Sequence, residues 1–239
     1  MPVILSLVLC CLLLSSPLLA AGTDTDSGQP SVLQAYRAIY TAKYNGMPLE
    51  AQRQLIALEQ GYRLEVSAKS FLGNMHESEN IHLDSEGRIR IDGYASKRSF
   101  FGNKRTEKLT IDHQQNKAVY TRKNKRRETS LLAEHLGPIS YQLQLRRDLF
   151  KPDSPLDYSV IARGKVKNYR FQRAGEEVVD TGLGKFTAQK VRRLRDEKDR
   201  ETVFWMAGEL AYLPVKIWQR EDNGESYEMT LKSVVFTGQ

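Results

Sequence analysis

Apolar and polar residues alternate along most of the chain beyond residue 35. Over residues 35–45, one side of an extended segment would carry Tyr36, Ala38, Tyr40, Ala42 and Tyr44. This period of two is typical of β-strands that bury one face. Turn signals separate the runs at Gly61, residues 84–87, residues 114–117 and the Asn223-Gly224 pair. The pattern predicts about a dozen strands that follow one another as an antiparallel meander.

One segment follows a helical period instead. Residues 137–151 read GPISYQLQLRRDLFK, with Pro138 where a first helical turn tolerates proline and further prolines just beyond the end. One face of this helix would carry Ile139, Leu143, Arg146 and Phe150. We therefore predict a mainly β chain, a single antiparallel meander curled into an open barrel, with one mid-chain helix. An alternative has the helix separating two β-lobes near residue 150, but one continuous domain is simpler and is favoured.

The N-terminal residues predict export. Residues 3–21 contain no charge, Pro17 interrupts the apolar run, and the small residues Ala20, Ala21 and Gly22 follow, as a signal-peptidase site requires. The predicted organisation is a signal peptide over residues 1–21, a linker over residues 22–31 and a β-domain over residues 32–239. The expected location is the periplasm. The alternative is a membrane anchor formed by an uncleaved N-terminal segment.

Both cysteines of the chain, Cys10 and Cys11, lie inside this apolar run. The mature chain would therefore contain no disulfide, and its core alone would hold the domain together. A lipid-attachment site at Cys10 is not expected, because Leu9 precedes it where a small residue is needed.

The chain carries 36 Lys+Arg and 29 Asp+Glu, a formal net charge of +7. This excess favours contact with anionic surfaces such as lipid head groups, and nucleic acid is not expected as a partner behind a secretory signal. The densest basic run is a candidate contact with an anionic membrane surface, formed by Arg122, Lys123, Lys125, Arg126 and Arg127. The alternative interpretation of this run is a solvated hairpin tip.

No segment contains a motif that is typical of a catalytic site. His76 and His82 share one face of a predicted strand, but their six-residue separation spans about 20 Å, too far for one metal ion. The chain has no H-E-x-x-H and no G-x-S-x-G, and the GLGKF sequence at residues 182–186 is typical of a tight turn rather than of a phosphate-binding loop. We therefore predict no catalytic residues, no metal and no cofactor, and expect that the protein is not an enzyme.

The C-terminal third carries a resemblance to a known family. Its residues are a Thr-x-Leu-Gly turn, a strand alternating Val and Arg, a strand that reaches Trp, and a Tyr-Leu-Pro-Val segment. In this chain they are Thr181, Leu183, Gly184, Val191, Trp205, Tyr212, Leu213, Pro214 and Val215. With them, residues 33–236 resemble the bacterial exported domain-of-unknown-function family 3108. The resemblance implies a spiral β-roll with a helix crossing its open side, a role in envelope maintenance and no known activity. Where members of the family carry an Asp shortly before the helical serine, this chain has Gly137 and Pro138.

Three functions remain open at this stage. The first is a non-enzymatic periplasmic protein that binds an apolar ligand, a peptide or a partner protein of the envelope. Its ligand-binding residues would be Trp205, Tyr212, Trp218, Tyr36 and Tyr40, with Ile89 and Ile91 also lining an apolar cavity. Trp218 is expected to be half exposed, and Pro214 to lie at an edge, a strand start or a bulge. The second is an adaptor that uses the basic hairpin on anionic envelope surfaces. The third is a hydrolase of cell-wall or lipid material.

Overall fold

The computed structural model describes residues 31–71, 73–100, 102–131, 135–195 and 200–237. The predicted signal peptide, both cysteines and almost all of the predicted linker lie outside the described residues. Within them the predicted alternation is confirmed: strand β1 (Ala35–Tyr44), for example, buries Tyr36, Ala38, Tyr40 and Ala42. No helix of the described part of the chain has the length and apolar character needed to span a membrane.

In the part of the chain that the structure describes, two runs of strands flank one α-helix in chain order. The first run is β1, β2 (Met47–Ala57), β3 (Tyr62–Ser70), β4 (Gly73–Leu83), β5 (Ile89–Phe100), β6 (Asn103–Asp112), β7 (Lys117–Arg122) and β8 (Lys125–Ser130). Helix α1 (Ser140–Leu149) follows. The second run is β9 (Asp157–Ala162), β10 (Lys165–Thr181), β11 (Gly184–Leu194), β12 (Glu201–Ala207), β13 (Leu213–Arg220) and β14 (Ser226–Thr237), with a short 3₁₀ turn η1 (Gly208–Leu210) after β12. Turns fall where the sequence predicts them.

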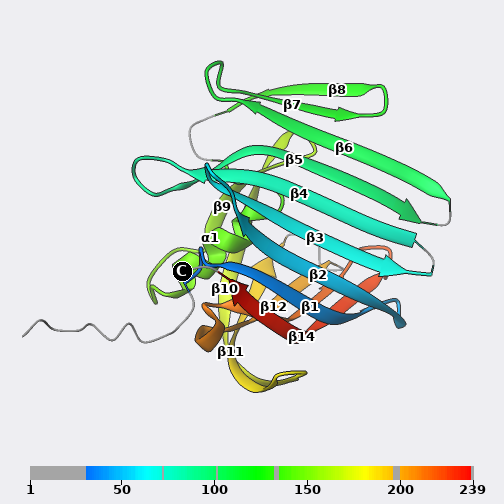
Figure 1. Cartoon of the computed structure of the whole chain (residues 1–239), viewed down its shortest axis with the longest axis vertical. Coiled ribbons are helices and arrows are strands. Elements are labelled where there is room, and N and C mark those ends of the chain that lie inside the picture. The colour runs from blue at the N-terminus through cyan, green and yellow to red at the C-terminus, as the bar shows by residue number, and fades with distance from the viewer. Residues whose placement is uncertain (1–30, 72, 101, 132–134, 196–199, 238–239) are drawn as a thin grey trace, which may run out of the picture.

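All 14 strands belong to one antiparallel sheet, in the order β8-β7-β6-β5-β4-β3-β2-β1-β14-β13-β12-β11-β10-β9. Each half is a meander, and the pairing of β1 with β14 joins the two halves, so the first and last strands lie side by side in the middle of the sheet (Figure 1). The predicted curled meander is therefore confirmed. The prediction of about a dozen strands was low by two, and one continuous sheet replaces the alternative of two separate lobes.

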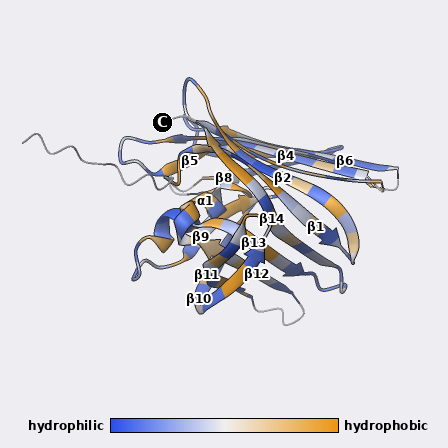
Figure 2. Cartoon of the chain, turned by 60° about the horizontal axis from the view of Figure 1, so that its bottom comes forward, coloured by the Kyte–Doolittle hydropathy of each residue, from blue (hydrophilic) through white to orange (hydrophobic). Residues whose placement is uncertain are grey.

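The sheet bends so that its two halves face each other. Figure 2 shows β2, β4 and β6 in one layer and β10–β13 in the other, with α1 between the layers. The helix contributes Leu143, Leu145 and Leu149, at most 5% exposed, to the core that both halves share. The position of α1 is therefore the one that the family resemblance implies for the helix.

One free edge of the sheet is covered by the segment before the helix. The Leu136 amide donates to the Ser159 carbonyl at 2.9 Å, and the Ile161 amide donates to the Leu136 carbonyl at 2.9 Å. Leu136 thereby forms a parallel bridge with Val160 on β9. This contact satisfies backbone groups that an edge strand would otherwise leave open to pairing with another chain.

Helix α1 begins later than the sequence suggests. Its N-cap residue is Ile139, so Pro138 lies before the helix rather than in its first turn, and no side chain of the helix itself caps its N-terminus. The cap comes instead from β4: the Glu79 carboxylate accepts from the Ile139 amide at 2.7 Å and from the Ser140 amide at 3.2 Å. Glu79 is fully buried. A carboxylate from a distant strand thus serves the N-terminal amides of the helix, which have no partner within it.

At the other end of the helix the sequence prediction was wrong for Phe150. This residue was expected on the buried face, but it is the C-cap and is 51% exposed. Its ring contacts Tyr212 edge to face, with ring centroids 4.9 Å apart. The helical period continues in the sequence for one residue longer than the helix does, which explains the difference.

The tryptophan segment is a structural hairpin made of β12 and β13. Residues directly opposite each other across an antiparallel pair point to the same face. Val203 lies opposite Trp218, and Trp205 lies opposite Lys216, so both tryptophans share one face of the sheet. Phe204 belongs to the other face, which faces the interior and contacts the core residue Phe171.

The two tryptophans therefore lie on the outer face. Trp205 was expected to line an interior cavity, but its indole N–H donates to Glu177 at 2.7 Å on the outside of the sheet. Trp218 is half-buried, as predicted. Pro214 is the second residue of β13 and adjoins a register shift in the β12–β13 pair, which confirms its predicted place at a strand start and bulge.

Candidate functional site

A polar cavity of about 340 Å³ lies between the two halves of the sheet. One wall comes from β4, β5 and β6, and the opposite wall comes from β9–β13 and the residues beside them. Its lining includes six cationic side chains: Arg98, Arg163, Lys167, Arg193, Arg195 and Arg200. Three carboxylates also line it: Glu77, Glu107 and Glu221. This composition differs from the apolar interior that the sequence led us to expect.

Alternation along β11 turns Arg193, and Arg195 just beyond the end of the strand, into the cavity. Val191 lies opposite Phe204 and therefore on the interior face, and Arg193 and Arg195 follow at intervals of two. Arg192 points outward and pairs across strands with Glu201 at 3.3 Å. The sequence analysis did not identify Arg193 and Arg195 as candidate site residues.

The carboxylates of the cavity already have cationic partners. Glu77 accepts from Arg98 at 2.5 Å and from the Tyr94 hydroxyl at 2.8 Å. Glu221 pairs with Arg200 at 2.7 Å. Their negative charge is therefore committed to two of the six cations.

The third carboxylate, Glu107, is also engaged away from the remaining cations. It forms an ion pair with Arg105 and lies 3.9 Å from the Arg122 guanidinium. Glu107 is 7% exposed, so this pairing takes place in a largely desolvated position.

Four cations of the lining have no carboxylate partner among the described residues: Arg163, Lys167, Arg193 and Arg195. The Arg195 guanidinium donates to the Thr202 hydroxyl at 3.0 Å. Burial lowers the pKa of Arg195, and repulsion from Arg193 and Arg200 lowers it further. Glu221 attracts Arg195, but within the described residues no carboxylate forms an ion pair with any of these four cations.

Lys167 and Arg193 belong to the same group of cations. Burial lowers the pKa of Lys167, and the nearby charges of Arg163, Arg200 and Arg193 lower it further. The Arg193 guanidinium stacks on the Tyr169 ring at 3.3 Å from its centroid, so its position is fixed by an aromatic face rather than by an acid. Its Nε is buried and has no hydrogen-bond acceptor within the described residues. The side chains of this wall produce a positive electrostatic potential in the cavity.

The five residues predicted to bind a ligand do not come together. Tyr36 and Tyr40 are buried in the core, at 4% and 0% exposed, and the Tyr40 hydroxyl donates to the Pro214 carbonyl at 2.9 Å. Ile89 and Ile91 are packed in the same core. Tyr212 lies in the turn between β12 and β13, while Trp205 and Trp218 lie on the outer face. None of these residues lines the cavity, and their role in binding stays a prediction.

The basic run forms a hairpin tip, as one of the two interpretations predicts. Arg122 ends β7, Lys123 lies in the turn, and the exposed residues Lys125, Arg126 and Arg127 begin the edge strand β8. Arg126 pairs with Glu128 at 2.7 Å. The Arg127 guanidinium donates to the Arg163 carbonyl at 2.9 Å, which ties the hairpin to the β9–β10 turn beside the cavity. Contact of this hairpin with an anionic surface stays a prediction.

Known proteins resemble this chain in fold and in sequence family. No curated protein is significantly similar to this chain. A candidate lipoprotein from Parabacteroides distasonis superposes with a TM-score of 0.31 at 11% identity, covering 86% of this chain and 97% of its own. A candidate exported protein with a YmcC-like fold from Bacteroides fragilis superposes with a TM-score of 0.27 at 12% identity. The match covers 87% of this chain and 97% of that protein. The family described as "Protein of unknown function (DUF3108)" matches residues 39–232. The chain belongs to this family, as its C-terminal residues suggested.

Proposed function

We propose that this chain is an exported, non-enzymatic binding protein of the cell envelope that holds a phosphate-bearing ligand in the cavity between the two halves of its sheet. The N-terminal sequence supports export, and the ligand chemistry comes from the cavity. The observation that carries the proposal is the group of four cations, Arg163, Lys167, Arg193 and Arg195, that no described carboxylate neutralises.

Charge count and geometry favour phosphate. Four cations without an ion-paired carboxylate among the described residues suit a doubly charged group better than a singly charged one. Guanidinium forks donate two parallel hydrogen bonds to a phosphate, and such bonds are stronger away from bulk water. The volume of about 340 Å³ lies at the lower end of the range of small-molecule sites, roughly 300–1,000 Å³. A wholly apolar ligand, one of the three kinds of binding partner expected from sequence, would leave these cations desolvated without compensation.

Isothermal titration calorimetry with inorganic phosphate tests the proposal. We expect the full chain to bind phosphate, with affinity falling as salt is raised because part of the attraction is screened. Lys167→Gln and Arg195→Gln should each weaken binding by roughly 10- to 100-fold, the effect of losing one charged hydrogen bond. Arg126→Gln, in the exposed hairpin, removes one positive charge outside the cavity and is the matched control.

Unchanged phosphate affinity in both cavity variants would contradict the proposal. Binding of an uncharged apolar fluorophore such as N-phenylnaphthylamine, with no phosphate binding, would return the function to the apolar ligand that the sequence suggested. Both results can be obtained on the same preparations.

A second candidate function is an adaptor on anionic envelope surfaces. Its observation is the exposure of Lys125, Arg126 and Arg127 on an edge strand of the sheet. Vesicles containing phosphatidylglycerol would then bind the wild type and Arg195→Gln equally, and would bind Arg126→Gln more weakly, by at most about 1 kcal/mol. The hydrolase alternative gains no support from Glu79, a buried carboxyl that caps helix α1 instead of lining the cavity.

A further inference from the structure

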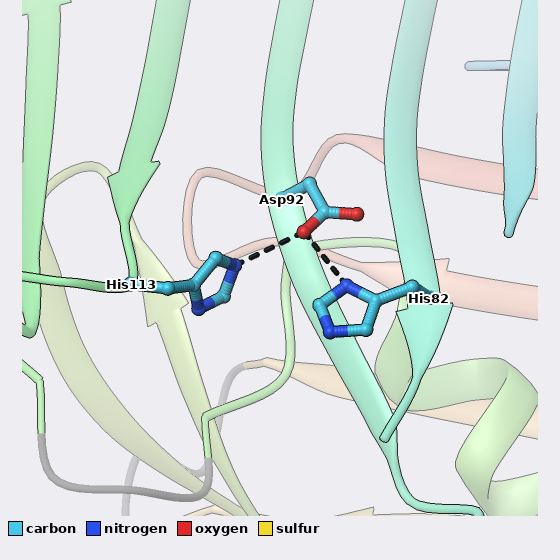
Figure 3. Close-up of side chains that lie close together, drawn as sticks. All are labelled: His82, Asp92 and His113. Atoms are coloured by element: carbon cyan, nitrogen blue, oxygen red, sulfur yellow. Dashed lines mark hydrogen bonds and ion pairs between the residues drawn. The ribbon is translucent and has the colours of Figure 1, made fainter. Parts of the chain in front are cut away.

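Three side chains of metal-binding type meet on neighbouring strands, away from the cavity. His82 lies on β4, Asp92 on β5, and His113 directly after β6 (Figure 3). His82 Nδ1 lies 2.8 Å from Asp92 Oδ1, and His113 Nε2 lies 3.0 Å from the same oxygen. One ligand atom from each residue can be chosen so that all three lie within 4.8 Å of one another. The two imidazole rings meet edge to face, with centroids 5.4 Å apart.

A β-bulge brings the carboxylate to this position. In the β4–β5 pair, Asn80 lies opposite Gly93 and Ile81 lies opposite Ile91, so Asp92 is the extra residue with no partner. Bulges re-aim a side chain and disturb the alternation of faces. Asp92 therefore lies between the histidines of the two flanking strands. Sequence spacing could not show this, because the three residues come from three strands and depend on one register shift.

His82 points away from the cavity. Its neighbour Ile81 is buried in the core at 1% exposed, and strand alternation places His82 on the outer face. The side chains of His82, Asp92 and His113 are 38%, 39% and 50% exposed, so a ligand in solution can reach all three. His76, which the sequence analysis considered together with His82, is exposed and is not part of this group.

We propose that His82, Asp92 and His113 form a zinc site on the outer face of the sheet. Two imidazole nitrogens and one carboxylate oxygen form a ligand set that Zn²⁺ accepts in tetrahedral geometry, with a fourth position left open. Ca²⁺ and Mg²⁺ prefer oxygen ligands alone, so two histidines disfavour them. Zinc–ligand bonds of about 2.0–2.2 Å require neighbouring ligand atoms roughly 3.3 Å apart. The three atoms reach this spacing through small rotations of the exposed side chains.

The cation opposite His82 is already engaged by a carboxylate. Arg90 lies opposite His82 in the β4–β5 register, but its guanidinium is held by Asp84 at 2.9 Å. Both hydrogen bonds within the group end on Asp92 Oδ1, so Zn²⁺ replaces them with direct bonds to the same carboxylate and the two rings. The open fourth position takes water or a side chain supplied by another molecule.

Zinc titration of the untagged protein tests this site. The full chain would carry Cys10→Ser and Cys11→Ser, so that no thiolate competes for the metal. We expect one equivalent of Zn²⁺ per chain, measured by competition with a chromophoric chelator, and a rise in melting temperature on adding zinc. His82→Ala, His113→Ala and Asp92→Ala should each lower the affinity by at least about 100-fold, since even the supporting residues of a zinc site contribute about 10- to 100-fold. His76→Ala, on the same strand as His82, is the matched control.

Cobalt provides an independent readout. Co²⁺ in the wild type should show the intense visible absorption of a four-coordinate site, and His82→Ala should abolish it while circular dichroism shows an intact fold. Absence of stoichiometric zinc binding by the wild type would overturn the proposal. An equal loss of affinity in His76→Ala and His82→Ala would overturn it as well.

Discussion

Substitution of Glu79 by glutamine should change how the stability of this protein depends on pH. Glu79 is fully buried and accepts hydrogen bonds from the Ile139 and Ser140 amides at the start of α1. Two effects oppose each other at this carboxyl. Burial disfavours its charged form, whereas the amide hydrogen bonds and the positive end of the helix favour it. Burial is the larger effect and raises the pKa of Glu79 to about 7 from an ordinary value of 4.5.

The difference between these pKa values sets the magnitude. The folded protein keeps a proton on Glu79 between pH 4.5 and 7, where the unfolded chain has already lost it. The free energy of unfolding therefore contains a contribution that is fully present below pH 4.5 and is lost as pH rises through 7. Each pH unit in this window lowers stability by about 1.4 kcal/mol, or about 3.5 kcal/mol over the whole window. Because glutamine cannot ionise, the stability of Glu79→Gln does not contain this decrease with rising pH.

Urea denaturation at constant ionic strength, followed by tryptophan fluorescence, measures the effect. Between pH 5 and 8, we expect the stability of Glu79→Gln to rise relative to wild type by about 2–3 kcal/mol. Glu59→Gln removes a carboxylate from the exposed turn between β2 and β3 and serves as the control. Parallel pH profiles for wild type and Glu79→Gln would refute the reasoning. If the stability of Glu79→Gln instead fell relative to wild type as pH rises, the hydrogen bonds at the helix terminus, rather than burial, would determine the pKa of Glu79.

Two further substitutions test packing that the structure specifies. Gly137→Ala should lower the free energy of unfolding by about 1–3 kcal/mol, because the added Cβ would overlap Glu79 Oε1. In a Glu79→Ala background this cost should largely vanish. A double-mutant cycle that shows no coupling between the two positions would contradict the contact. Trp205→Phe should cost about 1 kcal/mol in urea denaturation, because phenylalanine cannot donate to Glu177. Unchanged stability of that variant would show that the outer-face hydrogen bond contributes nothing.

Much of the fold could be predicted from sequence because its signal is local. The period of two identifies strands one at a time, and Gly61 or the Asn223-Gly224 pair marks turns within a few residues. A meander needs little more, since consecutive strands pair with each other. The pairing of β1 with β14, which makes one sheet of two meanders, depends on contacts about 190 residues apart, such as Thr41 with Thr230, and no local pattern contains it.

The sites could not be predicted for related reasons. The Val191-to-Arg195 alternation was visible in the sequence, but it does not say which face of β11 turns inward. The cap of α1 comes from Glu79, 60 residues before Ile139. The sequence next to the helix shows only that the expected acidic residue is absent there. The register shift at Asp92 has no sequence signature that we recognise. Local periodicity therefore predicts strands, whereas register and curvature decide which polar side chains meet.

The central claim, that the interior cavity holds a phosphate-bearing ligand, is tested most directly by native mass spectrometry. The protein would be purified gently from its own envelope as wild type, as the double variant Lys167→Gln/Arg195→Gln, and as the hairpin variant Arg126→Gln. The account predicts an added mass that contains phosphate in the wild type and in Arg126→Gln, and its loss in the double variant. A bare wild-type mass, or a phosphate-free ligand that persists in the double variant, would contradict it.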